Sequence, residues 1–272
     1  MIRALLMSLL LISGVIIQTS AQESEVIIIG NVHSPMPNYN SDTLFKILEK
    51  LNPDVILLEI DSAHFTTDNK FKYSSTENEQ TATTKYIKKH SSVKIGPFEF
   101  EGRNEYRLQN GIKQSDQPAM QLLDSLFTSK LLTNEQAAIV TAYHRLTDTL
   151  NAFGYKGAYY FNNKNTDSIS KIRQYYQHYK LREVINQREE FTYRFVTTTT
   201  GEKITLQEGY NRQCDFWDLR NQTMARNIIK VIDKNPNKRI IVLTGYFHRY
   251  YLLEEIAKIK YNRNFSIKEF YN

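Results

Sequence analysis

The stretch VIIIGNVH, residues 26–33, decides the fold. It opens with four consecutive β-branched apolar residues and ends with a glycine and a histidine. Two more short apolar runs, residues 55–58 and 240–243, are likewise bounded by turn-forming residues. Continuous runs of this length are typical of strands that are buried on both faces of a parallel sheet. The sequence therefore predicts an α/β protein.

A helix is predicted between the first two runs. Residues 42–51 carry apolar side chains at helical spacing, Ser41 or Asp42 can cap the start, and Asn52-Pro53 ends the pattern. A strand, a helix and a strand within about 35 residues have the size of one βαβ unit.

The other end of the chain repeats this style. A helix is predicted to begin near Phe216 with Asp215 as its cap, a strand follows at residues 240–244, and a helix covers residues 249–260. Between the two ends, mostly polar helices and a hairpin are expected, at residues 77–90, 117–129, 134–151 and 168–190 for the helices and 191–196 with 203–206 for the hairpin. The expected fold is thus a central, mostly parallel sheet built from both chain ends, with a large helical insertion over roughly residues 75–190.

Residues 1–21 have the features of a signal peptide. Arg3 gives a positive start, residues 5–17 are almost wholly apolar, and Thr19-Ser20-Ala21 supplies the small residues of a cleavage site. The apolar stretch is too short for a permanent anchor. We expect an exported, periplasmic or extracellular protein with no stable membrane span after cleavage and one domain over residues 22–272.

Composition excludes several classes of protein. Of 272 residues, 24% are charged and 41% hydrophobic, which is ordinary for a globular chain. The net charge is +6, but basic and acidic residues are interleaved and no nucleic-acid motif occurs, so no nucleic-acid partner is expected. Cys214 is the single cysteine, so no intramolecular disulfide can form.

Polar residues follow each apolar run. His33 follows the first, Glu59 and Asp61 follow the second, and His248 follows the third. Parallel strands place their carboxyl ends along one edge of a sheet, where ligands bind. Because Glu59 and Asp61 are two residues apart, we expect both carboxylates to point to one side. Two imidazoles and two carboxylates should therefore meet at this edge.

Arg220 and Asn221 are expected to join that group. They fall on the inward face of the helix predicted to begin near Phe216. An arginine on an apolar stripe is rarely buried without a partner, so Glu59 or Asp61 is its expected partner. Asn221 is expected to have a structural role. Three other histidines fall in polar helical segments and are expected to lie at the surface or to be hydrogen-bonded, namely His90, His144 and His178.

Four motifs, in this order, resemble the TraB/Tiki superfamily, which includes TraB/GumN-like, ChaN-like and erythromycin-esterase-like proteins. They are GNVH at residues 30–33, LEID at residues 58–61, RNQTMA at residues 220–225 and GYFH at residues 245–248. The resemblance covers the two ends of the chain, and the middle agrees only in being long and helical. It implies metal-dependent or general-base hydrolysis, with proteolysis ascribed to the Tiki branch.

Carried onto this chain, the resemblance implies His33, Glu59 and His248 as the central polar groups and Arg220 as the cationic helper. The chain departs from the family pattern in two ways. Many TraB-like sequences have an arginine three residues after the Glu-x-Asp, where this chain has His64, which loosens any transfer of substrate preference and offers a further imidazole. In addition, the two glycines are followed by Asn31 and Tyr246 rather than by small residues, so we expect a tighter or differently shaped pocket.

Two chemical versions stay open. In the first, His33, Glu59 and His248 bind a divalent metal ion that lowers the pKa of a bound water, and Arg220 stabilises the developing negative charge. In the second, His33 is a general base oriented by Glu59, and His248 is the acid. Both predict an exported hydrolase of an amide or ester bond, with a peptide as the leading substrate and a small molecule as another.

Two non-enzymatic alternatives remain. A binding protein of the same fold would hold a metal complex, a haem-like ligand or a peptide signal without turnover. A purely structural module would have its inward polar groups fully paired with one another and no accessible cavity between them.

Overall fold

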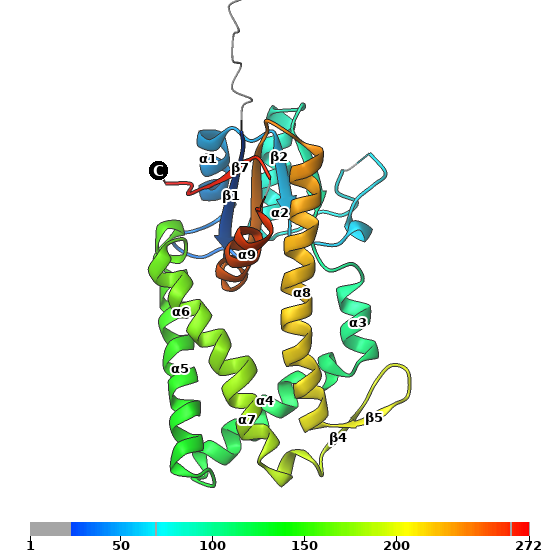
Figure 1. Cartoon of the computed structure of the whole chain (residues 1–272), viewed down its shortest axis with the longest axis vertical. Coiled ribbons are helices and arrows are strands. Elements are labelled where there is room, and N and C mark those ends of the chain that lie inside the picture. The colour runs from blue at the N-terminus through cyan, green and yellow to red at the C-terminus, as the bar shows by residue number, and fades with distance from the viewer. Residues whose placement is uncertain (1–22, 69, 262, 272) are drawn as a thin grey trace, which may run out of the picture.

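Five parallel strands form the central sheet of the computed structural model, which describes residues 23–68, 70–261 and 263–271 (Figure 1). The order is β3-β2-β6-β1-β7, with bounds Ser24–Asn31 for β1, Val55–Leu58 for β2, Lys94–Pro97 for β3, Arg239–Gly245 for β6 and Phe265–Lys268 for β7. The predicted α/β class, with a sheet built from both chain ends, is confirmed. The predicted signal peptide lies outside the described residues.

The position of β6 decides where the polar motifs meet. It lies between β1 and β2 and pairs with both, from Glu25↔Arg239 to Asn31↔Gly245 on one side and from Val55↔Ile240 to Leu58↔Leu243 on the other. The two Gly-x-x-His motifs therefore follow the neighbouring strands β1 and β6. Glu59 follows β2, which lies on the other side of β6.

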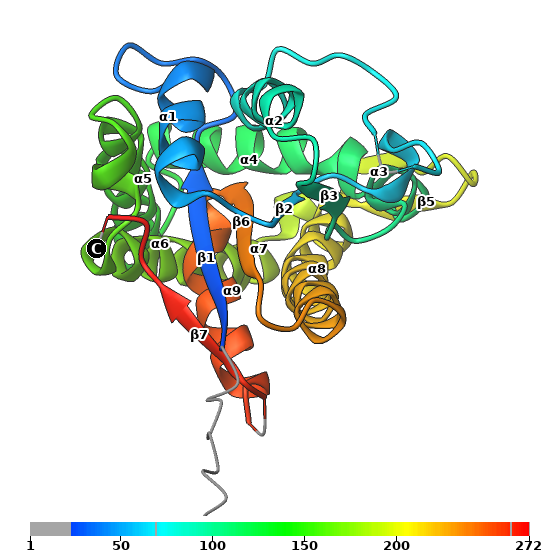
Figure 2. The ribbon, with the colours of Figure 1, turned by 90° about the horizontal axis from the view of Figure 1, so that it is seen from above.

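Helices cover both faces of the sheet (Figure 2). On one face lie α1 (Ser41–Leu51) and α2 (Asn78–Lys89), and on the other lie α8 (Leu206–Lys234) and α9 (Tyr246–Ile259). Successive side chains of β1 point to opposite faces, so Ile27 and Ile29 join the first core while Val26 and Ile28 join the second. Both faces are thus buried, as the continuous apolar runs predict.

The helical part of the chain has a core of its own beyond the carboxyl ends of the strands (Figure 1). Side chains such as Leu123, Val140 and Leu181 form it. Its elements are α3 (Arg103–Gln109), α4 (Ile112–Thr128), α5 (Asn134–Gly154), α6 (Lys164–Tyr175), a π-helical turn at Tyr176–Lys180, α7 (Leu181–Asn186) and the hairpin of β4 (Phe195–Thr197) and β5 (Lys203–Thr205). Short 3₁₀ turns occupy Ser62–His64, Ala158–Phe161 and Glu189–Phe191.

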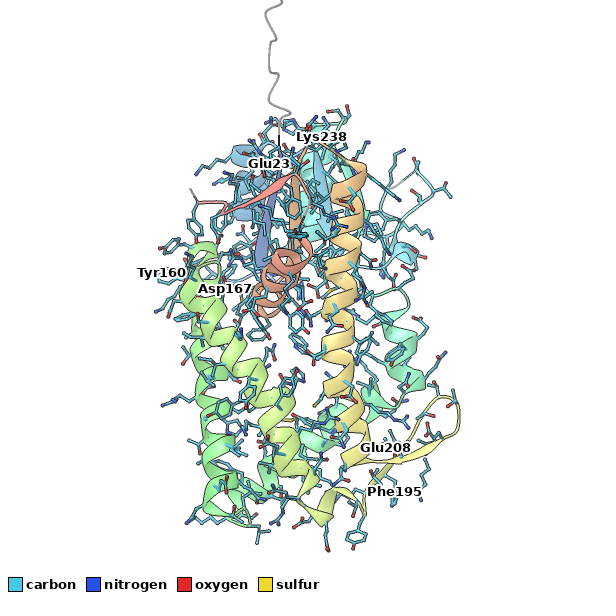
Figure 3. All side chains as sticks on the ribbon, in the orientation of Figure 1. Glu23, Tyr160, Asp167, Phe195, Glu208 and Lys238 are labelled. Carbon is cyan, nitrogen blue, oxygen red and sulfur yellow. The ribbon has the colours of Figure 1, made fainter. Side chains whose placement is uncertain are left out.

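Figure 3 marks the two extremes of the molecule. Glu23 and Lys238 lie at the amino end of the sheet, and Phe195 and Glu208 lie at the far end of the helical part. Among the described residues, no helix combines the length and the apolar character that a membrane crossing requires.

The predicted starts of two helices were wrong, and two strands were not predicted. Helix α8 begins at Leu206, capped by Thr205, rather than near Phe216, and Asp215 lies within it. The reason is that Leu206, Tyr210 and Cys214 extend the apolar stripe of the helix backwards into the helical core. Helix α9 follows β6 without a loop, so His248 lies in its first turn. Strands β3 and β7 were not predicted because each is only four residues long and is interrupted by lysine, glycine or serine, so neither forms a continuous apolar run.

Candidate active site

Glu59 occupies the centre of the polar group at the carboxyl edge. Because β2 pairs with β6 up to Leu58↔Leu243, Glu59 emerges beside Thr244 and Gly245. Its Oε2 accepts hydrogen bonds from Thr244 Oγ1 at 2.6 Å and from the Gly245 N–H at 2.7 Å. Its Oε1 pairs with Arg220 Nη2 at 2.5 Å. Burial alone would raise the pKa of Glu59, but the charges of Arg220 and His33 and the Thr244 hydrogen bond hold it below the usual range. Glu59 is therefore an ionised, fully engaged carboxylate.

Arg220 joins two buried carboxylates. Besides Glu59, it contacts Glu99, to which its Nε donates at 2.8 Å. Glu99 follows β3 and also pairs with Arg103 Nη1 at 2.9 Å and accepts from the Phe100 N–H at 2.7 Å. Sequence reasoning missed Glu99 because β3 was not recognised. The available signal was weak, since Glu99 follows a strand with the sequence Lys94-Ile95-Gly96-Pro97.

His248 is a neutral, buried imidazole. Its Nε2 lies 2.9 Å from Arg220 Nη1 and its Nδ1 lies 2.7 Å from Asn221 Oδ1. Because arginine only donates, Nε2 must accept, so Nδ1 carries the proton and donates to Asn221. The ring stacks on Trp217 with centroids 4.5 Å apart. Burial lowers the pKa of His248 to about 3.

His33 forms an ion pair with Glu79 and not with Glu59. Its Nδ1 lies 2.8 Å from Oε1 of Glu79, and the side chain of His33 is 50% exposed whereas that of Glu79 is 8% exposed. Helix α2 brings Glu79 there because Asn78 holds the His33 loop, donating from its backbone N–H to the His33 carbonyl at 2.8 Å and from Nδ2 to the Val32 carbonyl at 2.7 Å. The pairing with Glu79 raises the pKa of His33 to about 9, against the effect of burial. At neutral pH His33 is therefore an imidazolium.

The pairing of His33 corrects the hypothesis that Glu59 orients it. Strand β6 separates β1 from β2, so His33 and Glu59 approach across Gly245 instead of touching. A Cβ atom placed on Gly245 would lie 3.2 Å from His33 Nε2 and 3.7 Å from Glu59 Oε2. The glycine at this position is what lets the two groups come so close.

Asp61 and His64 lie apart from this group. Strand β2 ends at Leu58, so Glu59 and Asp61 do not share one side of a strand. Asp61 caps the 3₁₀ turn by accepting from the Ala63 N–H at 3.2 Å, and its Oδ1 lies 4.0 Å from His64 Nε2. The exposed His64 ring makes an edge contact with Tyr73. Arg220 therefore pairs with Glu59 and not with Asp61.

A cavity of about 350 Å³ opens beside His33 and His248. It lies between the carboxyl edge and the helical part, and its walls are Asn31, Val32, His33, Arg173, Gln174, Gln177, His178, Gln213, Trp217, Gly245, Tyr246, Phe247 and His248. A second cavity of about 20 Å³ lies among His33, Glu59, Glu77 and Glu79 and has the size of one water molecule. His33 lines both cavities.

The expectation that His178 lies at the surface or is hydrogen-bonded was wrong. Its side chain is buried, and neither ring nitrogen has a hydrogen-bond partner among the described residues. It stacks on the face of Trp217 with centroids 4.8 Å apart. Burial holds the pKa of His178 well below its usual range, so this imidazole is neutral. The sequence did not predict the burial of His178, because the residue lies in a π-helical turn, where the regular α-helical spacing does not apply.

The three predicted metal ligands do not fit a metal ion in this arrangement. Both oxygens of Glu59 and both ring nitrogens of His248 already have partners, and His33 Nδ1 faces Glu79. Within the described part of the chain, no three histidine, cysteine or acidic side chains converge as metal ligands do. The donor set thus offers a metal too few open positions.

No protein-family model, curated protein or solved structure matches this chain significantly. The resemblance to the TraB/Tiki superfamily therefore rests on the four motifs alone.

Proposed function

We propose that this chain is a hydrolase that cleaves an amide or ester bond in the cavity beside His33, with a peptide as the leading substrate class. The observation that carries the proposal is the His33–Glu79 pair. A buried carboxylate oxygen lies 2.8 Å from one ring nitrogen of His33 as an ion pair, while the other nitrogen faces Gly245 in the cavity wall and has no partner among the described residues. General acid–base catalysis uses this kind of arrangement.

The protonation state of His33 makes it the proton donor. As the oxygen of a water molecule bonds to the carbonyl carbon, the C–N or C–O bond breaks and the Nε2 proton of His33 passes to the leaving nitrogen or oxygen. The protonated carboxylic acid that forms holds both protons of the water. It passes one of them to the neutral imidazole of His33, so the carboxylic acid and the amine or alcohol are released and the protein ends in its starting state. The 20 Å³ cavity beside His33 has room for the one water that the reaction consumes.

Negative charge on the reacting oxygen would meet the N-terminus of α9. Tyr246 and Phe247, the first residues of that helix, line the cavity, and the N-cap residue Gly245, whose own N–H donates to Glu59, has no side chain that could cap their N–H groups. Backbone N–H groups at a helix start favour a developing anion. We assign Glu59, Arg220 and His248 positioning roles, because their mutual pairing holds β2, α8 and α9 around the cavity.

The proposed chemistry uses no metal ion. Membership of the TraB/Tiki superfamily and export of the protein remain predictions. A non-catalytic binding protein is the alternative. It shares the cavity and differs only in lacking turnover.

Hydrolysis of p-nitrophenyl acetate and of a mixture of internally quenched peptides by the purified protein tests the proposal. We expect turnover, and a loss of about 100- to 10,000-fold in kcat/KM for His33→Gln, as for removal of a general acid. His144→Gln is the matched control, because it removes a similar pair, His144 with Asp124 at 3.1 Å, on the surface of the helical part. Equal activity of His33→Gln and the wild type would refute the role of His33. Absence of turnover in the wild type would favour the binding protein.

A further inference from the structure

Arg173 is a buried cation without a counter-charge. It belongs to α6, lines the 350 Å³ cavity and is 8% exposed. Its Nε donates to Thr147 Oγ1 at 3.2 Å and its Nη2 donates to Tyr143 Oη at 2.8 Å. Its Nη1 donates to the side-chain carbonyls of Gln174 and Gln177. All four acceptors are neutral, and no carboxylate of the described residues forms an ion pair with it.

The walls of the cavity supply donors and lack carboxylates. Since Gln174 and Gln177 turn their carbonyl oxygens to Arg173, their amide NH₂ groups are left without hydrogen-bond partners among the described residues. The ring N–H of His178, which also lines the wall, likewise has no hydrogen-bond partner among the described residues. The His33 imidazolium, whose charge is paired with Glu79, adds an N–H donor to the wall, and none of the thirteen lining residues is acidic. Such a surface attracts an anion and repels a cation.

The local backbone supports a ligand-binding role. Gln177 and His178 lie in the π-helical turn that follows α6, and π-helical turns are rare and are frequent at functional sites. The turn places these two residues and Arg173 on the same cavity wall. Trp217, Tyr246 and Phe247 add aromatic surface, and the buried Gln213 Oε1 lacks a partner among the described residues and can accept an N–H.

We propose that this cavity binds an oxyanion, a carboxylate or phosphate group, attached to a flat body that carries an N–H donor. The oxyanion pairs with Arg173 and takes the donors of Gln174, Gln177 and His178. A guanidinium ion matches both carboxylate and phosphate geometry, so the chemistry of the site is shared by the two groups. The conclusion that the substrate carries an oxyanion rests on the proposed function. Binding of an oxyanion in the cavity can be measured without any turnover.

The test is calorimetric binding of hippurate and its neutral amide, hippuramide, to the full protein, with phenyl phosphate as the phosphate probe. We expect hippurate to bind at least about tenfold more tightly than hippuramide. Preferential binding of phenyl phosphate would also support the oxyanion site and would assign phosphate as its group. Equal binding of hippurate and hippuramide with no binding of phenyl phosphate, or no binding of either anion, would overturn the proposal.

An isosteric variant of Gln177 and a control variant sharpen the test. Gln177→Glu places a carboxylate against Arg173 and supplies the missing charge from within, so we expect at least a tenfold weaker affinity for whichever anion binds the wild type and a smaller change in hippuramide binding. Lys171→Gln is the control, because it removes a charge from the same helix at a side chain that is 57% exposed and pairs with Glu254. Wild-type anion affinity in Gln177→Glu would refute the role of Arg173. Anion binding without hydrolysis of any ester or peptide would refute the proposed function alone.

Discussion

A hydrogen bond of 2.7 Å from the Gly245 backbone N–H to the Glu59 carboxylate joins the carboxyl ends of β2 and β6. The two residues come from opposite ends of the chain, and the bond exists because β6 lies beside β2 in parallel register. Arg220, on α8, completes the link by pairing with the other oxygen of Glu59. One buried carboxylate thereby ties two strands and a helix together at the edge where the cavity opens.

Glu59→Gln is expected to destabilise the protein by about 3 kcal/mol, because it removes one charge of a buried, hydrogen-bonded ion pair. Urea unfolding measures the difference. Asp42→Asn, which removes the exposed acid that pairs with Lys85, is the control and should have a small effect. Similar stability changes in the two variants would mean that the network around Glu59 contributes little.

Glu79→Gln is expected to lower the pKa of His33 from about 9 toward the value of about 6.5 for an unpaired histidine. If the protonated form is active, activity of the wild type should fall above about pH 9, and activity of the variant should fall about two pH units lower. Since the folded pKa is the higher one, stabilisation by the pair should be complete below about pH 6.5 and lost as the pH rises through 9. NMR titration of His33 and pH–rate profiles measure both effects, and identical profiles would contradict the pairing.

Acid is expected to destabilise the protein through His248. Its folded pKa of about 3 lies below the unfolded value of about 6.5, so its contribution to stability is full above pH 6.5 and decreases as the pH falls toward 3. In His248→Gln, the slope of unfolding free energy against pH between about 4 and 6 should decrease by about 1.4 kcal/mol per pH unit. Chemical unfolding at several pH values gives this slope. Parallel slopes would show that His248 is protonated in the folded protein.

Gly30→Ala is expected to destabilise the protein by about 1–3 kcal/mol, as overpacking does. The added Cβ would lie 2.8 Å from Cβ and 2.9 Å from Cα of Tyr246, where α9 begins, so the backbone itself would have to move. Gly96→Ala is the matched control in β3, because its Cβ would meet Leu57 Cδ2 at an ordinary 3.8 Å. Thermal unfolding of both variants compares them. Equal melting temperatures would mean that α9 can shift freely at this point.

Chelators are expected to leave activity and melting temperature unchanged, since the proposed chemistry uses His33 and no metal ion. Activity after dialysis against EDTA, with elemental analysis of the same sample, measures this. A loss of activity that Zn²⁺ or Mn²⁺ restores would require Glu59 and His248 to exchange their present partners for a metal.

The sequence alone determined the α/β class, the three central strands and the arrival of His33, Glu59 and His248 at one edge. It did so because buried parallel strands are recognisable from continuous apolar runs, and parallel strands end on the same side. The expectation that Arg220 pairs with an acid also came from the sequence, since an inward-facing guanidinium needs a partner.

Only the tertiary structure decided which partners these residues have. Strand β6 lies between β1 and β2 and therefore separates His33 from Glu59. His33 pairs instead with Glu79, which lies on helix α2. Glu99 reaches Arg220 through β3, and the cavity with Arg173 and His178 depends on how α6 and its π-helical turn pack over the strand ends. Local sequence patterns show the periodicity of an element and which polar side chains need a partner when buried. Contacts between distant segments depend on strand order and helix packing, which are determined by the whole chain.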